Sequence, residues 1–572
     1  MEAKSVKRFN TVGPCVPSEH YMLPVLPRLP LVNDMIASKF YFILHAPRQS
    51  GKTTFLDFLT DKINNNGTMY ALNCSVAAVR DLTDAELAMK EIVSQINKSM
   101  SRSPIDSIKK LAYASDSLPG LTLTTMVNIL LNNLCERLDK ELVIFFDEAD
   151  CIQEKALIPF LSQIRDGYNY RHKIGNKFPR SMALVGMRDI RDYLTQVRPD
   201  EQSKGVASPF NVKKEAFTLP NFTEKEIGTL YRQHTEATGQ VFEDSAIAKA
   251  WSWTEGQPWL VNALADNVIT YQLNNDYKAF ITGQHIDRAA QTLILRNDTH
   301  FDSLKERIKE FRVRRVIEAV LIGASKFPVG ISPDDVKYVI DLGLLKDNPT
   351  NPDDLKIANP FYQEIITRCL SSNIQYKIDN KLLKNYSIKW MDGFSLDMTG
   401  LLKAFQIYWS ENSEMFLKSN KFDSLVDDSI DAVVRKKSLP DYLDFSKEVI
   451  DDIKNSLVDL TNEALIHLVL HAFLQRVVNG DADFIQREYA LGSLRADICV
   501  SYKDRRYPLE LKIKDHKSQS ASLEQLFGYM NKCLASEGWL VVFDKDFAKP
   551  WDKKINWKTR KYKGKTIHIV GC

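Results

Sequence analysis

The sequence has no cysteine spacing that builds a zinc knuckle or a disulfide scaffold. Its eight cysteines are scattered along the chain, and no two of them form a CxxC pair. Isolated thiols of this kind are typical of proteins in a reducing compartment. The cysteines therefore indicate neither a zinc knuckle nor a disulfide scaffold, and we expect a cytoplasmic protein.

The sequence also lacks an apolar run long enough to cross a bilayer. The most apolar helical stretch, residues 464–473, is interrupted by His467 and His471. It falls far short of the ~20 residues that a crossing requires. Residues 1–10 are polar and basic, and no apolar stretch follows them as it would in a signal peptide. We expect no membrane partner.

A strong charge imbalance and internal repeats are absent as well. The 572 residues carry a formal net charge of +3, so any surface that binds nucleic acid must be local. Hydrophobic residues make up 44% and charged residues 26%, the proportions of a soluble globular protein. At ~150 residues per domain, the length predicts about three or four domains.

Strands and helices alternate in the first third of the chain. Four short apolar runs are predicted strands, and helix-forming stretches such as 84–98 and 121–138 lie between them. This alternation predicts a parallel sheet covered by helices on both faces. The predicted strands are 40–45, 68–74, 142–146 and 181–185.

The first predicted strand runs into a phosphate-binding loop. Residues 46–53 fit the pattern A/G-x-x-x-x-G-K-T, and a helix is predicted directly after them. In such a loop Gly51 permits close backbone approach, Lys52 reaches the β and γ phosphates, and Thr53 ligates magnesium. We therefore predict a site for ATP and Mg²⁺ made by Ala46, Pro47, Arg48, Gln49, Ser50, Gly51, Lys52, Thr53 and Thr54.

The third predicted strand ends in two acids. Asp147, at its carboxyl end, is suited to hold the magnesium shell, and Glu148 beside it is suited to polarise the attacking water. The plainer alternative is a strand that ends in solvated acids. Both motifs stand in the expected order, which favours the functional interpretation. The pair predicts that ATP is hydrolysed as well as bound.

Two further features admit both a structural and a functional interpretation. Arg188 follows the fourth strand, where a cation can sense the γ-phosphate or reach a neighbouring subunit's site. A surface arginine paired with Asp189 or Asp192 fits equally well. Residues 256–259, Gly-Gln-Pro-Trp, interrupt a helical region, and a turn with Trp259 in the core accounts for them too.

A second group of charged residues lies near the C-terminus on two predicted strands. If residues 494–501 and 507–513 form an antiparallel hairpin, their apolar side chains share one face. Asp497, Glu510 and Lys512 then share the other face, with a two-residue loop at either 504–505 or 503–504. The loop at 503–504 puts Asp497 directly opposite Glu510. A three-residue loop would break this parity.

Two carboxylates and one ammonium on a single face suit metal-dependent cleavage of phosphodiesters. Asp497 and Glu510 would hold Mg²⁺ through oxygen. Lys512 would position the water or stabilise the charge that develops at phosphorus. Glu463, in the preceding predicted helix, is a candidate to complete the metal shell. The alternative is an ordinary half-exposed sheet whose polar face carries Asp, Glu and Lys.

Other residues of this region are candidates for contact with nucleic acid. Gln525 and Tyr529 lie four apart on the next predicted helix and hence on one face. In residues 551–565, lysines and arginines alternate with tryptophan and tyrosine, a mixture that binds phosphates and stacks on bases. A solvated charged hairpin is the alternative for that last segment.

The motifs resemble those of a known family. Residues 9–14, 45–53, 146–150 and 256–259 are similar to those of the archaeal-type and STAND branch of the AAA+ ATPases, over about residues 1–370. The resemblance implies a helical lid in which Pro258 lies near the nucleotide base, and it implies assembly into a homo-oligomer. The acids and lysine near the C-terminus, with Gln525 and Tyr529, resemble a PD-(D/E)XK nuclease-like domain over roughly 445–572.

We therefore predict an α/β protein of five parts. Residues 304–370 read as helices followed by a small β-hairpin, the order of a winged-helix module, and residues 371–444 read as a helical connector. The predicted parts are a P-loop AAA+ core (1–220), a helical lid (221–303), a winged-helix-like region (304–370), a connector (371–444) and a nuclease-like domain (445–572).

The predicted function joins the two sites. The chain would bind and hydrolyse ATP, act on nucleic acid, most simply DNA, and cut it with Mg²⁺ under ATP control. The alternative is an ATP-driven switch or scaffold whose C-terminal domain binds nucleic acid or a partner without cutting. A role in defence or for a mobile element rests on analogy alone.

Overall fold

The computed structural model describes most of the chain and divides it into two compact units. Unit 1 comprises Met1–Leu295 with Ile340–Leu344, and unit 2 comprises Arg296–Val339 with Leu345–Cys572. The described residues are 6–112, 122–173, 177–187, 213–296, 299–321, 331–346, 355–377, 395–417, 465–474, 485–487, 498–502, 505–514, 519–544, 546 and 549–572.

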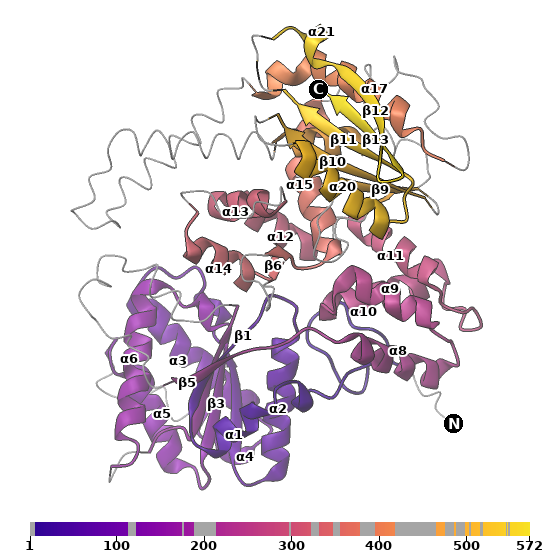
Figure 1. Cartoon of the computed structure of the whole chain (residues 1–572). Coiled ribbons are helices and arrows are strands. Elements are labelled where there is room, and N and C mark those ends of the chain that lie inside the picture. Colours follow the sequence, from indigo (N-terminus) through magenta and orange to yellow (C-terminus); the bar gives the residue numbers. More distant parts are fainter. Residues whose placement is uncertain are drawn as a thin grey trace, which may run out of the picture. The chain divides into compact units, whose positions relative to one another are not determined.

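Unit 1, shown in Figure 1, is built on a five-stranded parallel sheet. The strand order is β2-β3-β4-β1-β5. The four apolar runs predicted as strands are β1 to β4. A fifth strand, β5, was not predicted, because only Ala216 and Phe217 of its residues pack against the cores. The strands are β1 (Tyr41–His45), β2 (Tyr70–Ser75), β3 (Leu142–Asp147), β4 (Ser181–Gly186) and β5 (Lys213–Thr218).

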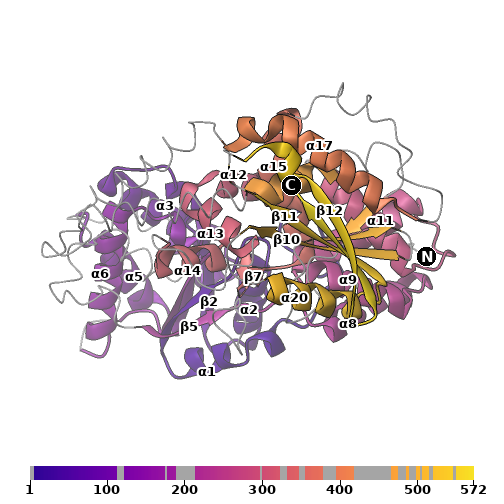
Figure 2. The ribbon, with the colours of Figure 1, turned by 45° about the horizontal axis from the view of Figure 1, so that its top comes forward.

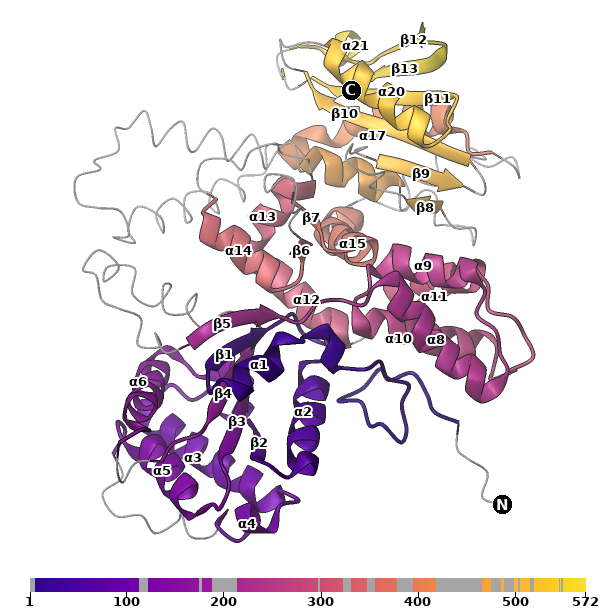
Figure 3. The same cartoon turned by 60° about the horizontal axis from the view of Figure 1, so that its bottom comes forward.

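Helices cover both faces of this sheet, as the alternation predicted (Figure 3). One face packs against α1 and α2, and the other packs against α3, α4, α5 and α6. The helices are α1 (Leu31–Ala37), α2 (Lys52–Asn66), α3 (Ala85–Arg102), α4 (Asp106–Lys109), α5 (Met126–Arg137) and α6 (Glu154–Tyr170), with short 3-10 turns η1 (Leu26–Arg28), η2 (Ala77–Val79) and η4 (Ala149–Cys151).

A run of helices follows the sheet. The first of them begins with a capping box: the Thr223 hydroxyl accepts from the N–H of Glu226, and the Glu226 carboxylate accepts from the N–H of Thr223. The run comprises α8 (Glu224–Thr238), α9 (Asp244–Thr254), α10 (Pro258–Asp266), the π-helical turn η6 (Asn267–Gln272) and α11 (Gly283–Leu295).

Unit 2 begins with helices and a short antiparallel hairpin. Leu345 pairs with Ile357, and Lys346 pairs with Lys356. Two arginines of α13 form ion pairs, Arg314 with Glu318 and Arg315 with Asp335. The elements are α12 (Thr299–Lys309), α13 (Phe311–Leu321), α14 (Pro333–Asp341), β6 (Leu345–Lys346), β7 (Lys356–Ile357) and α15 (Pro360–Lys377).

The C-terminal part of unit 2 is a six-stranded mixed sheet with the order β12-β13-β11-β10-β9-β8. The pairs β8·β9, β9·β10 and β12·β13 are antiparallel, and β10·β11 and β11·β13 are parallel. The elements are β8 (Ile485–Arg487), β9 (Ile498–Tyr502), β10 (Arg505–Ile513), α20 (Gln519–Lys532), β11 (Glu537–Phe543), α21 (Trp551–Lys554), β12 (Asn556–Tyr562) and β13 (Lys565–Gly571).

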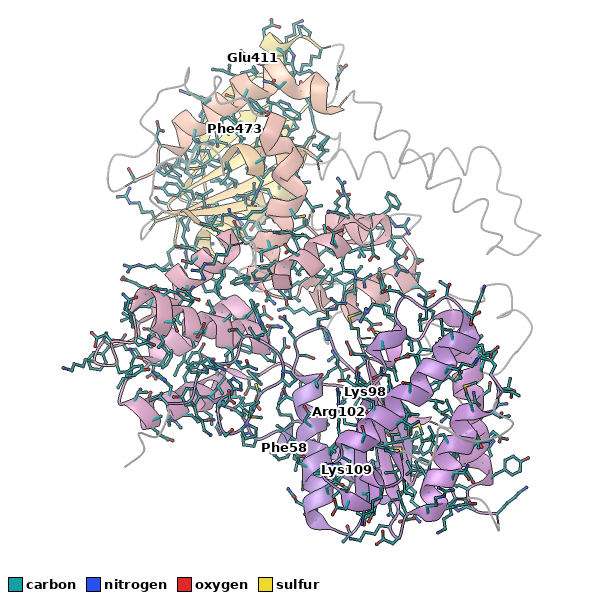
Figure 4. The ribbon with its side chains drawn as sticks, turned by 180° about the vertical axis from the view of Figure 1, so that it is seen from behind. Phe58, Lys98, Arg102, Lys109, Glu411 and Phe473 are labelled. Atoms are coloured by element: carbon teal, nitrogen blue, oxygen red, sulfur yellow. The ribbon has the colours of Figure 1, made fainter. Side chains whose placement is uncertain are left out.

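This second sheet lies between helices (Figure 2). On one face, α17 (Met398–Leu417) and the helical residues 465–474 share a core with β9, β10 and β11. Phe473 is labelled in Figure 4, and its ring centre lies 5.3 Å from that of Phe405 in α17. The other face packs against α20. Helix α17, assigned to the connector on sequence, therefore supplies part of the C-terminal core.

Candidate functional site

The loop between β1 and α2 has the backbone that a phosphate cradle requires. Ala46 is buried at the end of β1. Gln49 and Gly51 have φ angles of 57° and 91°, in the left-handed region that glycine tolerates best. A Cβ on Gly51 would meet nothing within 4 Å. The need for glycine therefore comes from the backbone angle rather than from crowding.

Lys52 lies at the centre of this cradle. Its Nζ donates to the carbonyl oxygens of Ala46 and Pro47, each at 2.7 Å. Burial lowers the pKa of Lys52 to about 8, and the carboxylates of Asp147 and Asp150 act in the opposite direction. The ammonium is thus held among carbonyl dipoles, where phosphate oxygens would be stronger partners.

We expect nucleotide binding to take up a fraction of a proton near pH 8.5. Free Lys52, with a pKa of about 8, is mostly neutral at that pH, whereas adjacent phosphate oxygens raise its pKa and favour the ammonium. Calorimetry with Mg-ATP in two buffers of different ionisation enthalpy measures this uptake. Near pH 7 the uptake should be small because Lys52 is already charged. Equal heats in both buffers at pH 8.5 would contradict the expectation.

Thr53 and Asp147, the two residues predicted to hold magnesium beside the nucleotide, lie together. The Thr53 hydroxyl donates to Oδ2 of Asp147 at 2.8 Å. Burial raises the pKa of Asp147, and the hydrogen bond from Thr53 opposes that rise. One hydroxyl and one carboxylate oxygen at this separation are ligand types that Mg²⁺ accepts, with water and phosphate completing the shell. The residues therefore fit the ion.

Glu148 is held beside this pair by residues that sequence reasoning missed. Its φ angle is 59°, in the left-handed region, directly after β3 ends at Asp147. Ser75 donates to its Oε2 at 2.9 Å, and Nη2 of Arg80 lies 3.8 Å from its Oε1. Ser75 ends β2 and is the register partner of Asp147. The ends of neighbouring parallel strands meet at one edge of a sheet. The position of Ser75 at the end of β2 was therefore the sequence signal that could have placed it beside Glu148.

Asp150 is a third acid at the same edge. Burial raises its pKa, and the ammonium of Lys52 is the largest opposing influence. A Cβ on Gly186, the last residue of β4, would lie 2.8 Å from Oδ1 of Asp150. A side chain at position 186 would displace this carboxylate. Sequence reasoning assigned Asp150 no role, since nothing local marks it as different from a solvated acid.

Three separate segments converge on the loop within unit 1. The side-chain amide of Gln257 reaches the carbonyl oxygen of Gln49 at 3.4 Å. The Trp259 indole donates to the carbonyl oxygen of Thr11 at 2.8 Å. The backbone N–H of Cys15 donates to the Thr54 hydroxyl at 3.0 Å. The lid, the N-terminal segment and the start of α2 are thus connected around the cradle.

The turn before Pro258 is sterically demanding. Gly256 has a φ angle of 78°, and a Cβ there would lie 1.7 Å from the carbonyl oxygen of Phe222. Pro258 is the first residue of α10 and is buried, a position that suits its missing N–H. The turn therefore needs glycine for close packing, and the role of Pro258 beside a nucleotide base stays a prediction. Arg188 lies outside the described residues.

The C-terminal hairpin has one of the two registers that the sequence allowed. Tyr502 pairs with Arg505, Val500 with Tyr507, and Ile498 with Leu509, which corresponds to the two-residue loop at 503–504. Ile498, Val500, Leu509 and Leu511 all lie in one core cluster, as parity predicted. Asp497 and Glu463 lie outside the described residues, so their positions stay predictions.

Glu510 and Lys512 share the opposite face of β10. Glu510 is fully buried, and Nζ of Lys512 lies 2.9 Å from its Oε1. Leu540, the register partner of Glu510 on β11, packs against Leu526 and Met530 of α20. This face is therefore covered by a helix. The half-exposed polar sheet, which was the plainer alternative, does not describe Glu510.

Gln525 and Tyr529 lie on the helix that covers this face. Nε2 of Gln525 donates to the Tyr529 hydroxyl at 2.8 Å, as residues four apart on one helical face can. Tyr529 is fully buried, whereas Gln525 is partly exposed. Among the described residues no group of three or more acidic, histidine or cysteine side chains is arranged to hold a metal.

Comparison with known proteins gives a likeness of fold at low identity. No family model matches the chain, and no curated protein does. The Walker-type ATPase PABY2304 of Pyrococcus abyssi is 14% identical, with a TM-score of 0.45 over 63% of this chain and 99% of its own. ORC2 of Aeropyrum pernix, in an ADPNP-ADP complex, is 15% identical, with a TM-score of 0.37 over 61% and 93%.

A third solved structure is similar over the same extent. Cdc6p of Pyrobaculum aerophilum is 14% identical, with a TM-score of 0.34 over 63% of this chain and 97% of its own. Unit 1 itself is a parallel-sheet α/β unit with a P-loop between β1 and α2. In the described part of the chain, no helix combines the length and hydropathy needed to span a membrane.

Proposed function

We propose that the protein binds and hydrolyses ATP at the end of β1 and β3. The observation that carries this proposal is the meeting of four side chains from two elements: Lys52 and Thr53 from α2, and Asp147 and Glu148 from the end of β3. Lys52 would bind the β and γ phosphates, and Glu148 would take the proton of the attacking water. Bound Mg²⁺ would neutralise phosphate charge beside Thr53 and Asp147.

Replacing Glu148 by glutamine should leave ATP binding intact and remove hydrolysis. The amide keeps the shape of the side chain but cannot accept a proton, and loss of such a base costs about 10²–10⁴-fold in rate. Phosphate release and fluorescent-nucleotide binding measure the two properties. Glu86→Gln is the matched control, because Glu86 pairs with Lys90 on the surface of α3. Wild-type turnover in Glu148→Gln would contradict the assignment.

The rest of the nucleotide site is proposed from the sequence resemblance. Pro258 would lie against the base, next to the turn that Gln257 ties to the loop. Arg188 would contact the γ-phosphate of its own or a neighbouring subunit in a homo-oligomer. Oligomerisation with and without ATP, measured by light scattering, tests the second idea. A monomer under both conditions would oppose it.

We further propose that the C-terminal part of unit 2 cleaves phosphodiesters with Mg²⁺. Its support is a buried carboxylate, Glu510, paired with Lys512, in a register compatible with Asp497 as the second acid. Burying one carboxylate is costly unless a cation compensates it, and here the ammonium of Lys512 supplies part of that compensation. Lys512 would then stabilise charge on the reacting phosphate.

Nucleic acid would contact the C-terminal sheet rather than α14. Three helices followed by the β6·β7 hairpin have the order of a winged helix. The first turn of α14, however, exposes Asp334, an acid that repels phosphates. The edge strand β12, in contrast, exposes Lys558, Arg560 and Lys561, charges that attract a phosphate backbone. We therefore propose DNA binding along β12.

Two assays on the whole chain, plasmid nicking and a gel shift, separate this function from the alternative. Plasmid nicking by the whole chain with ATP and Mg²⁺ supports a nuclease. A salt-dependent gel shift without nicking supports a switch that only binds nucleic acid. The absence of both nicking and binding would favour a signalling scaffold. That result would overturn both proposals for the C-terminal domain.

A further inference from the structure

Two cysteines of the C-terminal domain lie side by side in its interior. Sγ of Cys499, in β9, is 3.7 Å from Sγ of Cys533, which directly follows α20. The exposed fractions are 0% for Cys499 and 6% for Cys533. With Ala535 they form a small cluster separate from the larger cores. We propose that Cys499 and Cys533 are a site of reversible oxidation and that a disulfide between them ties α20 to β9.

The geometry requires only a small movement. A disulfide has a sulfur–sulfur distance of about 2.05 Å, so the sulfur atoms must approach by about 1.6 Å from their 3.7 Å separation. Cys499 is fixed in the sheet opposite Pro508. Cys533 ends the helix, and Leu534 after it has a φ angle of 56° and is 91% exposed. The turn at the surface can therefore supply the movement.

The bond would join two elements on the face that carries Glu510. Cys499 alternates with Ile498 and Val500, whose side chains lie in the core on the other face. The N–H of Cys533 donates to the carbonyl oxygen of Tyr529 at 2.8 Å. A covalent link at Cys533 thus restrains the last turn of α20 and, through it, Tyr529. The disulfide would hold the helix covalently on the sheet, whereas in the reduced protein non-covalent packing holds it there.

The chemistry balances with a hydroperoxide as the oxidant. The thiolate of Cys533, the more exposed of the two, attacks the peroxide O–O bond and becomes a sulfenic acid, and with hydrogen peroxide one water leaves. The Cys499 thiol then attacks that sulfur, a second water leaves, and the S–S bond forms. Two thiols lose two electrons and two protons in total. A dithiol reductant reverses the step by exchange.

Thiol counting and peptide mapping of the whole chain test the proposal without any assay of DNA cleavage. After brief hydrogen peroxide treatment and denaturation, titratable thiols should fall from eight to six. Mass mapping without reductant should find the peptides of Cys499 and Cys533 joined. Amide exchange in the last turn of α20 should slow and should recover with dithiothreitol.

Variants provide the controls. Cys533→Ser should keep all its remaining thiols under the same treatment. Cys15→Ser, in the other unit, should still lose two. The mapping on the wild-type chain does not depend on whether any variant folds. Eight surviving thiols, a disulfide between any other pair, or higher oxidation of Cys533 without a link to Cys499 would each overturn the proposal.

Discussion

ATP hydrolysis should fall about 10²–10³-fold when Lys52 is replaced by alanine, and nucleotide affinity should fall with it. Lys52 Nζ contacts the carbonyl oxygens of Ala46 and Pro47 inside the loop, where we propose that it binds the phosphates. Loss of one such preorganised donor in a buried site costs about 10²–10³-fold in rate. Removal of the charge weakens binding of the ground state too, because Lys52 contacts phosphate before and during reaction.

The measurement is steady-state phosphate release together with nucleotide titration. Glu148→Gln is the informative comparison, since it should lose hydrolysis while retaining affinity. Lys62→Ala, in the same helix α2 but ten residues further on, is the matched control for loss of a lysine and should behave as wild type. Unchanged affinity in Lys52→Ala would show that phosphate binding lies elsewhere and would remove the central assignment.

Phosphodiester cleavage should be lost in Glu510→Gln and in Lys512→Ala while ATP hydrolysis continues. Glu510 is fully buried beside Lys512, so each change removes one of the two charges of this pair. Loss of a metal-holding carboxylate or of the charge near phosphorus costs about 10²–10³-fold. The P-loop belongs to unit 1 and these residues belong to unit 2, so ATP turnover should stay near the wild-type rate.

The controls separate chemistry from folding. Glutamine keeps the volume of Glu510, and circular dichroism with thermal melting should show that the variants fold. Lys514→Ala removes a lysine two residues further on, whose Nζ pairs with Asp544 at 3.0 Å, and should still cleave. Asp497→Ala should behave like Glu510→Gln. If Lys514→Ala lost as much activity as Lys512→Ala, the loss would reflect the removal of a positive charge from this region rather than a specific role of Lys512 in the cleavage site.

The strand, loop and helix of the candidate nucleotide site could be predicted because the sequence pattern behind them is local. An apolar strand, a glycine-lysine turn and a helix are contiguous, so the spacing of Gly51, Lys52 and Thr53 carries their roles. Strand β3 and the acids at its end could be predicted for the same reason, because they are also contiguous in the sequence. Ser75, Arg80 and Asp150 escaped prediction for the opposite reason. Their contacts with Glu148 and Lys52 depend on which strand ends lie side by side, and no local pattern records that.

The C-terminal hairpin shows what the alternation of apolar and polar residues can predict and what it cannot. Alternation determined which side chains share a face, and the register of Ile498 with Leu509 agrees with one of the two loops considered. It did not determine what covers the face of Glu510. That depended on α20, whose Leu526 and Met530 pack against Leu540. It also did not assign α17 to the core of the same sheet, because an amphipathic helix does not specify its partner.

The sequence by itself determined the α/β class, the phosphate loop, the acids at the end of β3 and the two-faced character of β10. Each of these features depends on residues that lie close together in the sequence. Only the tertiary structure decided that Glu148 is held by Ser75 and Arg80, that Glu510 is buried, and that Cys499 lies against Cys533. Those contacts join segments far apart in the chain. They follow from how helices and strands fill space together, a property that no single segment contains.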